Sequence, residues 1–230
     1  MILFPCFGNT NEPTVGFTNL CIPPMSKWQN VPKIELHKHL EGAIRFSTVY
    51  ELSEELQGLS IEEARHKAMI FSPSTGLEKV FETFWVTQKI LKTTEIIERI
   101  SFEVCEDAVK DGIVILELRY QPSYIQINHL DLTFTQIHQA ILAGIKRAQE
   151  KYNICVGLIG IIGRNLTKEV AEQTTTFIIE NADTFVGCDL ANVELGYDCT
   201  IFTEYFRRLK EAGLHVTGNY VFVNILGTNI

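Results

Sequence analysis

Two histidines one residue apart follow a short apolar segment. The stretch PKIELHKHLEG (32–42) places His37 and His39 at positions i and i+2. In an extended strand, such side chains point to the same side of the sheet. Two converging imidazoles are typical of a metal site, although one could instead form a hydrogen bond in the core. A catalytic zinc ion needs three or more protein ligands and an open position for water, so the pair alone is incomplete.

Other metal signatures do not extend this pair. The HxHxDH signature of metallo-β-lactamase-type hydrolases would need Asp-His where the chain has Glu41-Gly42. The HxE…PCxxC signature of cytidine-type deaminases and the HExxH helix of zinc proteases are both absent from the sequence. The histidine pair by itself therefore leaves the class of reaction open.

Apolar segments that alternate with helical patterns must position these histidines. The strand candidates are residues 34–37, 113–120, 154–162, 184–190 and 215–217. Their continuously apolar character is typical of parallel strands buried on both faces. Helix starts are marked by the capping boxes Ser60/Glu63, Thr75/Glu78 and Thr133/Gln136. Helix ends are marked by Gly112 and Gly213. This order predicts an α/β fold with a parallel sheet.

Polar residues collect at the predicted carboxyl ends of the strands, where such folds place their functional sites. Besides the histidines, these ends carry Glu117, Arg119, Arg164, Asp189, Asn192 and Glu194. We expect Arg119 and Glu117 to form a buried structural network, because a planar guanidinium can hold two partners at once.

Composition and charge exclude several classes of partner. The 230-residue chain has 20 Lys and Arg against 28 Asp and Glu, and its net charge of −8 argues against binding to nucleic acid or to an anionic membrane. No apolar run approaches the roughly 18 residues that span a bilayer. Six cysteines without a CxxC pair are typical of free thiols in a reducing compartment, so we expect a cytoplasmic location.

Several motifs, in order, resemble those of the adenosine deaminase family of metal-dependent amidohydrolases. They are PKIELHKHLEGAIR, DGIVILELRYQPSY, VGLIGIIGR, VGCDLANVELGY and EAGLHVT, and they extend over about residues 30 to 217. The resemblance implies an (α/β)8 TIM barrel that binds one Zn²⁺ ion and a purine nucleoside. It also implies hydrolytic deamination of adenosine or deoxyadenosine to inosine or deoxyinosine, with adenine or an N6-substituted purine as alternative substrates.

The resemblance also assigns roles to individual residues. His37 and His39 match the first two zinc ligands, and His39 would also contact the substrate. Glu41 matches an acidic residue that contacts the ribose 5′-hydroxyl. Asn192 stands where the family usually has a glycine whose backbone contacts the purine.

A stripe of apolar residues in LEKVFETFWVTQKIL has two interpretations. The stripe consists of Leu77, Val80, Phe81 and Phe84. This spacing is typical of the core-facing side of a helix. The corresponding helix of the family instead covers the purine pocket with its apolar face, and both interpretations remain open.

The chain departs from the family after residue 217. The family continues its fifth strand with His-Ala-Gly-Glu, which supplies the third zinc histidine and the glutamate that protonates the purine. Here the strand continues as GNYVFVNILGTNI, without histidine or glutamate. We therefore expect about five barrel strands, an incomplete set of zinc ligands and no family catalytic residues. The alternative to an enzyme is a non-catalytic fragment or a binding or regulatory isoform.

These observations predict three segments. Residues 1–30 form an irregular N-terminal extension without the basic region of a secretory signal, and Met25 could equally be the true start. Residues 31–217 form the incomplete barrel, and residues 218–230 form a divergent apolar tail. With two free edges and an open interior, the isolated chain is expected to self-associate.

Overall fold

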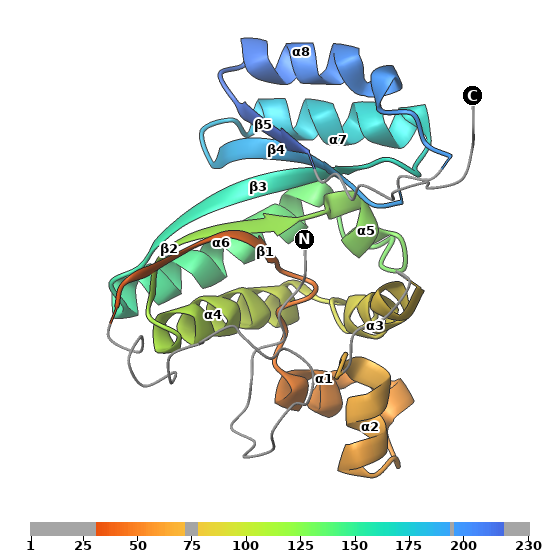
Figure 1. The fold of residues 1–230 in the computed structure, drawn as a ribbon, viewed down its shortest axis with the longest axis vertical. Helices are drawn as coiled ribbons and strands as arrows, with labels where there is room; N and C mark the ends of the chain where they lie inside the picture. The colour runs from red at the N-terminus through yellow and green to blue at the C-terminus, as the bar shows by residue number, and fades with distance from the viewer. Residues whose placement is uncertain (1–30, 72–77, 194–195, 219–230) are drawn as a thin grey trace, which may run out of the picture.

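A computed structural model describes residues 31–71, 78–193 and 196–218 (Figure 1). It contains a parallel sheet with the strand order β1-β2-β3-β4-β5. The strands are β1 (Lys33–His39), β2 (Ile113–Tyr120), β3 (Cys155–Gly163), β4 (Phe185–Ala191) and β5 (His215–Gly218). The predicted α/β fold with about five barrel strands is confirmed, while the division of the chain into three segments remains a prediction.

Helices connect the strands in the expected order. They are α1 (Phe46–Leu52), α2 (Ile61–Ala68), α3 (Glu78–Gln88), α4 (Thr94–Lys110), α5 (Pro122–Gln126), α6 (Phe134–Lys151), α7 (Lys168–Glu180) and α8 (Thr203–Glu211), with short 3-10 turns at Glu54–Leu56 and Cys199–Phe202. None of the helices that the structure describes is long and apolar enough to cross a membrane.

The helix boundaries follow local chemistry. Ser60 and Thr133 each accept a hydrogen bond from the third helical N–H, and complete capping boxes begin α2 and α6 as predicted. The predicted box at Thr75 lies outside the described residues. Gly112 and Gly213 end helical segments at φ 79° and 83°, a left-handed conformation that glycine adopts without steric cost.

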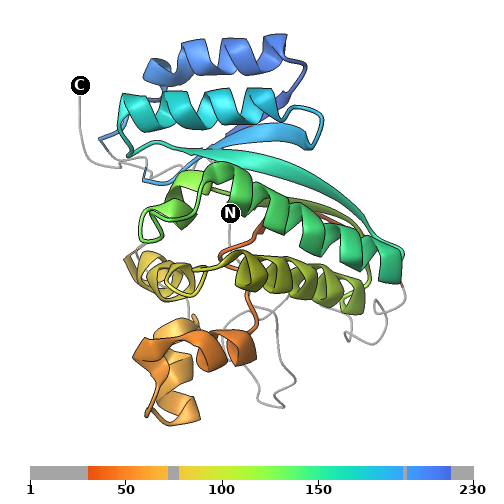
Figure 2. The ribbon, with the colours of Figure 1, turned by 180° about the vertical axis from the view of Figure 1, so that it is seen from behind.

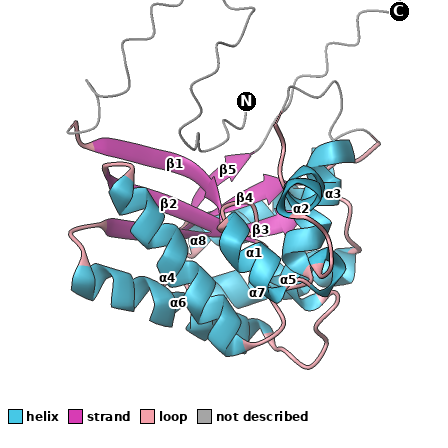
Figure 3. Ribbon diagram, turned by 90° about the horizontal axis from the view of Figure 1, so that it is seen from below, coloured by secondary structure: helices cyan, strands magenta, loops and turns pink. Residues whose placement is uncertain are grey.

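The long helices α4 and α6 lie on one side of the sheet, as Figure 3 shows from below. On that covered side, Leu116, Leu118 and Tyr120 are fully buried. On the other side, Ile34 and Ile115 are 59% and 41% exposed. The expectation that the strands are buried on both faces is therefore wrong for the described part, because helices cover only one of them.

The two long helices α4 and α6 cover β2 and β3 and lie side by side (Figure 2). Gly144 of α6 lies against α4, where an added Cβ atom would overlap the carbonyl oxygen of Glu98 and the side chain of Ser101. The backbones of the two helices are therefore in direct contact at this crossing, which only glycine permits.

A buried histidine links this helical layer to the sheet. The Thr184 hydroxyl donates to the Asn181 carbonyl, so it can accept the Nε2–H of His138 at 2.8 Å. The Nδ1 atom of His138 then accepts the Tyr120 hydroxyl at 2.9 Å. The imidazole also stacks on the ring of Phe185. This arrangement uses both nitrogens of a neutral imidazole, and burial lowers the pKa of His138 to about 4, although Asp183 opposes the shift.

We expect His138 to make the fold sensitive to acid. Its pKa is about 4 in the folded chain and 6.5 ordinarily, so the unfolded chain binds the proton more tightly. Stability should fall as the pH drops from about 6.5 to 4, by up to about 3 kcal/mol from this group. Urea unfolding across this range should show a smaller loss in His138→Gln than in wild type.

The exposed His66 provides the control for this prediction. His66→Gln should retain the wild-type dependence of stability on pH, because this side chain lies largely in solvent on α2. Equal pH dependence in wild type and His138→Gln would contradict the role given to His138.

Candidate metal and purine site

The two histidines converge at the carboxyl end of β1. Their Nε2 atoms are 3.3 Å apart, and their ring centroids are 5.3 Å apart. Both side chains point to the same side, as their i, i+2 spacing predicts. Without a metal, this contact can also be a hydrogen bond between one protonated and one unprotonated nitrogen.

The geometry of the pair fits two ligands of a tetrahedral zinc ion. Zn–N distances of about 2.0–2.1 Å and tetrahedral angles place two nitrogen ligands roughly 3.3–3.4 Å apart. Burial, then His37 and Arg119, lower the pKa of His39 to about 3. Burial and Arg119 also lower the pKa of His37, while Asp189 and Glu35 oppose the shift. Both imidazoles are therefore neutral at pH 7, the form that binds metal.

The described residues do not complete a metal shell around this pair. Among residues 31–71, 78–193 and 196–218, no group of three or more His, Cys, Asp or Glu side chains gathers as a metal site would require. The structure thus supports two converging nitrogen ligands, and their function as metal ligands remains a prediction.

Arg119 forms a structural network beneath the histidines. Its Nη1 atom binds Asp189 of β4 at 2.8 Å, and its Nη2 atom donates to the Leu36 carbonyl of β1 at 2.6 Å. Both charged side chains are buried. Arg119 therefore connects β1, β2 and β4, and its ionic partner is Asp189, which the sequence analysis had not paired with it.

Glu41 is buried immediately beyond the histidines. Its Oε1 atom accepts the backbone N–H of Gln121 at 2.9 Å, and only 2% of the residue is exposed. Burial raises the pKa of Glu41 to about 7, against the opposing effect of that hydrogen bond. The hydroxyl of Tyr124, whose pKa burial and Glu41 raise, is buried without a hydrogen-bond partner among the described residues. This corner therefore contains polar groups that a ligand hydroxyl could bind.

Asn192 adopts the left-handed conformation that its family counterpart suggests. Its φ is 79°, a value that asparagine tolerates better than most other residues with a side chain. Its amide donates to Gln121 Oε1 at 3.1 Å and to Asn165 Oδ1 at 3.0 Å. The backbone shape that glycine would provide is thus retained in the described structure.

Gln121 is a residue that the sequence analysis missed. Its backbone holds Glu41, and its side chain accepts the Asn192 amide and donates to Ser123. It directly follows β2, so its place at a strand carboxyl end was the available signal.

Helix α3 brings one member of the apolar stripe to the histidines. The Phe84 ring meets the His39 ring edge-on at 6.2 Å between centroids. A Cβ atom added at Gly42 would lie 2.9 Å from Phe84 Cζ. Val80 is half-buried. Leu77 and the side chain of Phe81 lie outside what the structure describes. Phe84 therefore borders the histidine site, while a covering role for the whole stripe remains a prediction.

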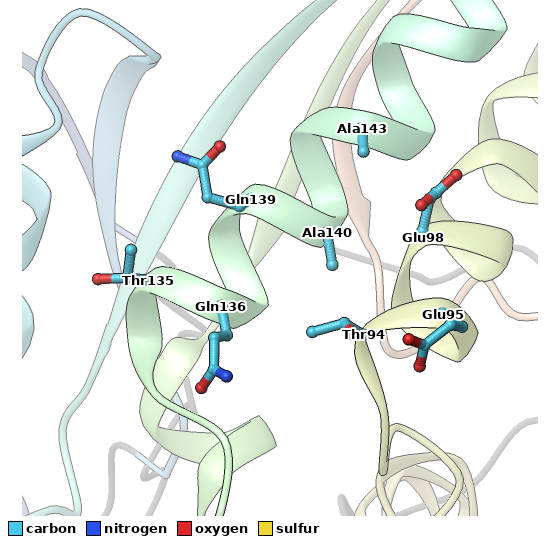
Figure 4. A pocket seen from close by; sticks show the side chains of 8 residues that line it. All are labelled: Thr94, Glu95, Glu98, Thr135, Gln136, Gln139, Ala140 and Ala143. Carbon is cyan, nitrogen blue, oxygen red and sulfur yellow. The ribbon is translucent and has the colours of Figure 1, made fainter.

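A separate hollow lies between α4 and α6 on the outer helical layer (Figure 4). It is lined by Thr94, Glu95, Glu98, Thr135, Gln136, Gln139, Ala140 and Ala143. None of the residues predicted for the site lines it. The chemistry of the chain is therefore expected at the carboxyl edge of the sheet rather than in this hollow.

Sequence comparisons identify relatives of this chain among known proteins. The adenosine deaminase family model matches residues 32–219. Over 195 residues, the chain is 27% identical to an adenosine deaminase from Shewanella denitrificans, covering 83% of this chain and 59% of the relative. An adenosine deaminase from Klebsiella pneumoniae is 27% identical over 192 residues, covering 82% and 57% of the two chains.

Solved structures show the same fold. The apo N6-methyl-AMP deaminase from Arabidopsis thaliana is 29% identical with a TM-score of 0.70, covering 85% of this chain and 59% of that one. An amidohydrolase from Burkholderia ambifaria with bound Zn is 22% identical with a TM-score of 0.75, covering 87% and 56%.

These matches show the family of the chain and how much of its relatives' length the chain spans. The chain spans less than three fifths of the length of the curated relatives described above. The family model nevertheless matches residues 32–219, from the strand that carries the histidines to the last described strand. The chain belongs to the adenosine deaminase family.

Proposed function

We propose that this chain forms the part of a zinc-dependent purine deaminase that contributes the first two metal ligands. The reaction is the hydrolytic conversion of adenosine or deoxyadenosine to inosine or deoxyinosine. The observation that carries the proposal is the separation of 3.3 Å between the Nε2 atoms of His37 and His39 at the carboxyl end of β1. Its support is the match of the chain to the adenosine deaminase family.

Each residue of the proposed site has a defined role. His37 and His39 hold the zinc ion as neutral imidazoles, and zinc supplies the activation of water for hydrolysis. Glu41, supported by Gln121, binds the ribose 5′-hydroxyl. The left-handed backbone at Asn192 brings its peptide group to the purine.

The apolar stripe completes the proposed pocket. Phe84 closes the histidine site against water, because its ring already contacts His39 and Gly42. Leu77, Val80 and Phe81, the other members of the predicted stripe, would extend this cover. Exclusion of water would strengthen the electrostatic interactions between the site and the substrate.

A second candidate substrate is an N6-substituted purine nucleotide, because a solved relative at 29% identity is an N6-methyl-AMP deaminase. Glu41 argues for the nucleoside. Its buried carboxyl would form a good hydrogen bond with a hydroxyl, whereas its ionised form would repel a 5′-phosphate. Adenine, and a binding or regulatory role without catalysis, are the remaining alternatives.

The metal proposal predicts loss of zinc affinity in two variants. His37→Ala and His39→Ala should each weaken Zn²⁺ binding by roughly tenfold or more, because each removes one of two nitrogen ligands. Competition with a chromophoric chelator measures the affinity. His66→Ala, at an exposed position on α2, should bind zinc as wild type does. Unchanged affinity in both site variants would refute the assigned ligands.

The catalytic proposal is tested by ammonia release. We expect no measurable deamination of adenosine by the 230-residue chain with zinc, because a missing general acid alone typically costs 10²–10⁴-fold. Residues 31–217 joined to the remaining strands of the Klebsiella relative should deaminate adenosine faster than N6-methyl-AMP. A folded, zinc-loaded chimera that is inactive on both substrates would overturn the proposal. Zinc-dependent turnover by the 230-residue chain would contradict the expectation that its set of catalytic residues is incomplete.

The backbone role of Asn192 is tested by two substitutions. Asn192→Gly loses two hydrogen bonds but removes the steric cost of the left-handed conformation, so its stability should remain within about 1 kcal/mol of wild type. Asn192→Ala loses the hydrogen bonds and keeps the cost, and should be less stable than Asn192→Gly by about 1 kcal/mol. Thermal unfolding measures both variants. An alanine variant as stable as the glycine variant would exclude a backbone constraint here.

A further inference from the structure

The strand that carries the histidines is not regular. Glu35 pairs with Leu116 and Lys38 pairs with Leu118, so β1 advances by three residues where β2 advances by two. Leu36 and His37 together therefore lie opposite Glu117. This is a β-bulge, which is rare between parallel strands and is often found where a side chain is re-aimed beside a functional site.

The bulge compensates an opposite shift earlier in the strand: from Lys33 to Ile34, β2 advances by two residues where β1 advances by one. After that first shift, only the bulge returns the histidines to the uncovered face of the sheet. With regular pairing after Glu35, His37 would lie opposite Leu118, and His39 would lie opposite Tyr120. Both partners are fully buried beneath the helices. Since a shift of one residue moves every following side chain to the other face, regular pairing would turn both imidazoles into the helical layer. In the observed register, His39 instead pairs with Arg119 on the uncovered face.

Two side chains bind the backbone groups that the bulge removes from regular pairing. The Glu35 carboxylate accepts the His37 backbone N–H at 2.8 Å. The Arg119 Nη2 atom donates to the Leu36 carbonyl at 2.6 Å. Backbone groups that lose their partners in a sheet need such replacements. The two residues thus hold opposite sides of the same peptide unit, which joins Leu36 to His37.

We infer that Glu35 and Arg119 are positioning residues for the proposed metal site: by clamping the Leu36–His37 peptide, they hold the bulge that points both imidazoles at one location. This inference deepens the proposed function and rests on it for the identity of the metal. The clamp itself is a property of the chain alone. Asp189 fixes the guanidinium from β4, so the orientation of the histidines depends on three strands.

Glu35 offers the cleaner substitutions, because it is only half-buried, whereas Arg119 is buried and forms an ion pair with Asp189. Glu35→Ala removes the acceptor of the His37 N–H, whereas Glu35→Gln retains a carbonyl oxygen in its place. Lys33→Ala, at the start of the same strand, is the matched control, since its side chain binds the distant Asp111 carbonyl. Arg119→Lys keeps a charge for Asp189 but loses the planar fork that reaches Leu36 as well.

The first measurement needs no metal. In wild type, Lys33→Ala and Glu35→Gln, proton NMR should show a nuclear Overhauser contact between the His37 and His39 rings and slow exchange of the His37 amide. Glu35→Ala should lose the ring contact and exchange this amide at least about tenfold faster. Arg119→Lys should lose the ring contact while keeping the circular dichroism of the folded chain.

The second measurement is zinc affinity by chelator competition. Loss of a group that orients metal ligands typically costs 10- to 100-fold in affinity, and we expect that loss in Glu35→Ala and Arg119→Lys with recovery in Glu35→Gln. A wild-type chain without zinc binding would refute the metal proposal, and the ring contact would still decide the clamp. If both Glu35→Ala and Arg119→Lys keep the ring contact and the protected amide, the clamp inference is wrong.

Discussion

The buried ion pair between Arg119 and Asp189 is the interaction on which the functional edge of the sheet depends. It crosses β3 to join β2 with β4, and its second guanidinium branch reaches the backbone of β1. Two charges taken out of water gain net stability only when their geometry and hydrogen bonds are good. Loss of one partner would leave the other charged and buried, at a typical cost of about 3–5 kcal/mol. A pair of this kind favours one arrangement of the strand ends over nearby alternatives.

Charged and neutral groups have different roles in the site. The ion pair and Glu35 fix where the histidines point, whereas the neutral amides of Gln121 and Asn192 shape the neighbouring corner around Glu41. Burial keeps the histidines unprotonated and the Glu41 carboxyl partly protonated near pH 7. A metal ion and a hydroxyl-bearing ligand therefore suit adjacent parts of the same strand edge.

Much of this architecture follows from local sequence signals. The strand Ile113–Tyr120 was predicted with its observed limits, because a largely apolar segment follows the helix-ending Gly112. The first strand was predicted as residues 34–37 but extends over Lys33–His39, since its lysines mask the pattern at both ends. The convergence of His37 and His39 followed from their spacing alone.

Other features depend on pairing between distant segments and could not be predicted. The bulge at Leu36 and His37 arises from the register of β1 against β2, about 80 residues away in the chain. The contact of Gln121 with both Glu41 and Asn192 joins three segments that no local pattern connects. The exposure of Ile34 and Ile115 reflects which face the helices cover, and an apolar run does not show this.

The contact between α4 and α6 at Gly144 has a consequence for inherited variation. The main chains touch there, so no repacking of side chains could make room for even one methyl group. Any missense change in this codon would push apart the helices that cover β2 and β3, although the histidines lie on the other side of the sheet. Such an allele would reduce the amount of folded protein in a cell rather than alter its chemistry, and a screen limited to residues near the histidines would overlook it.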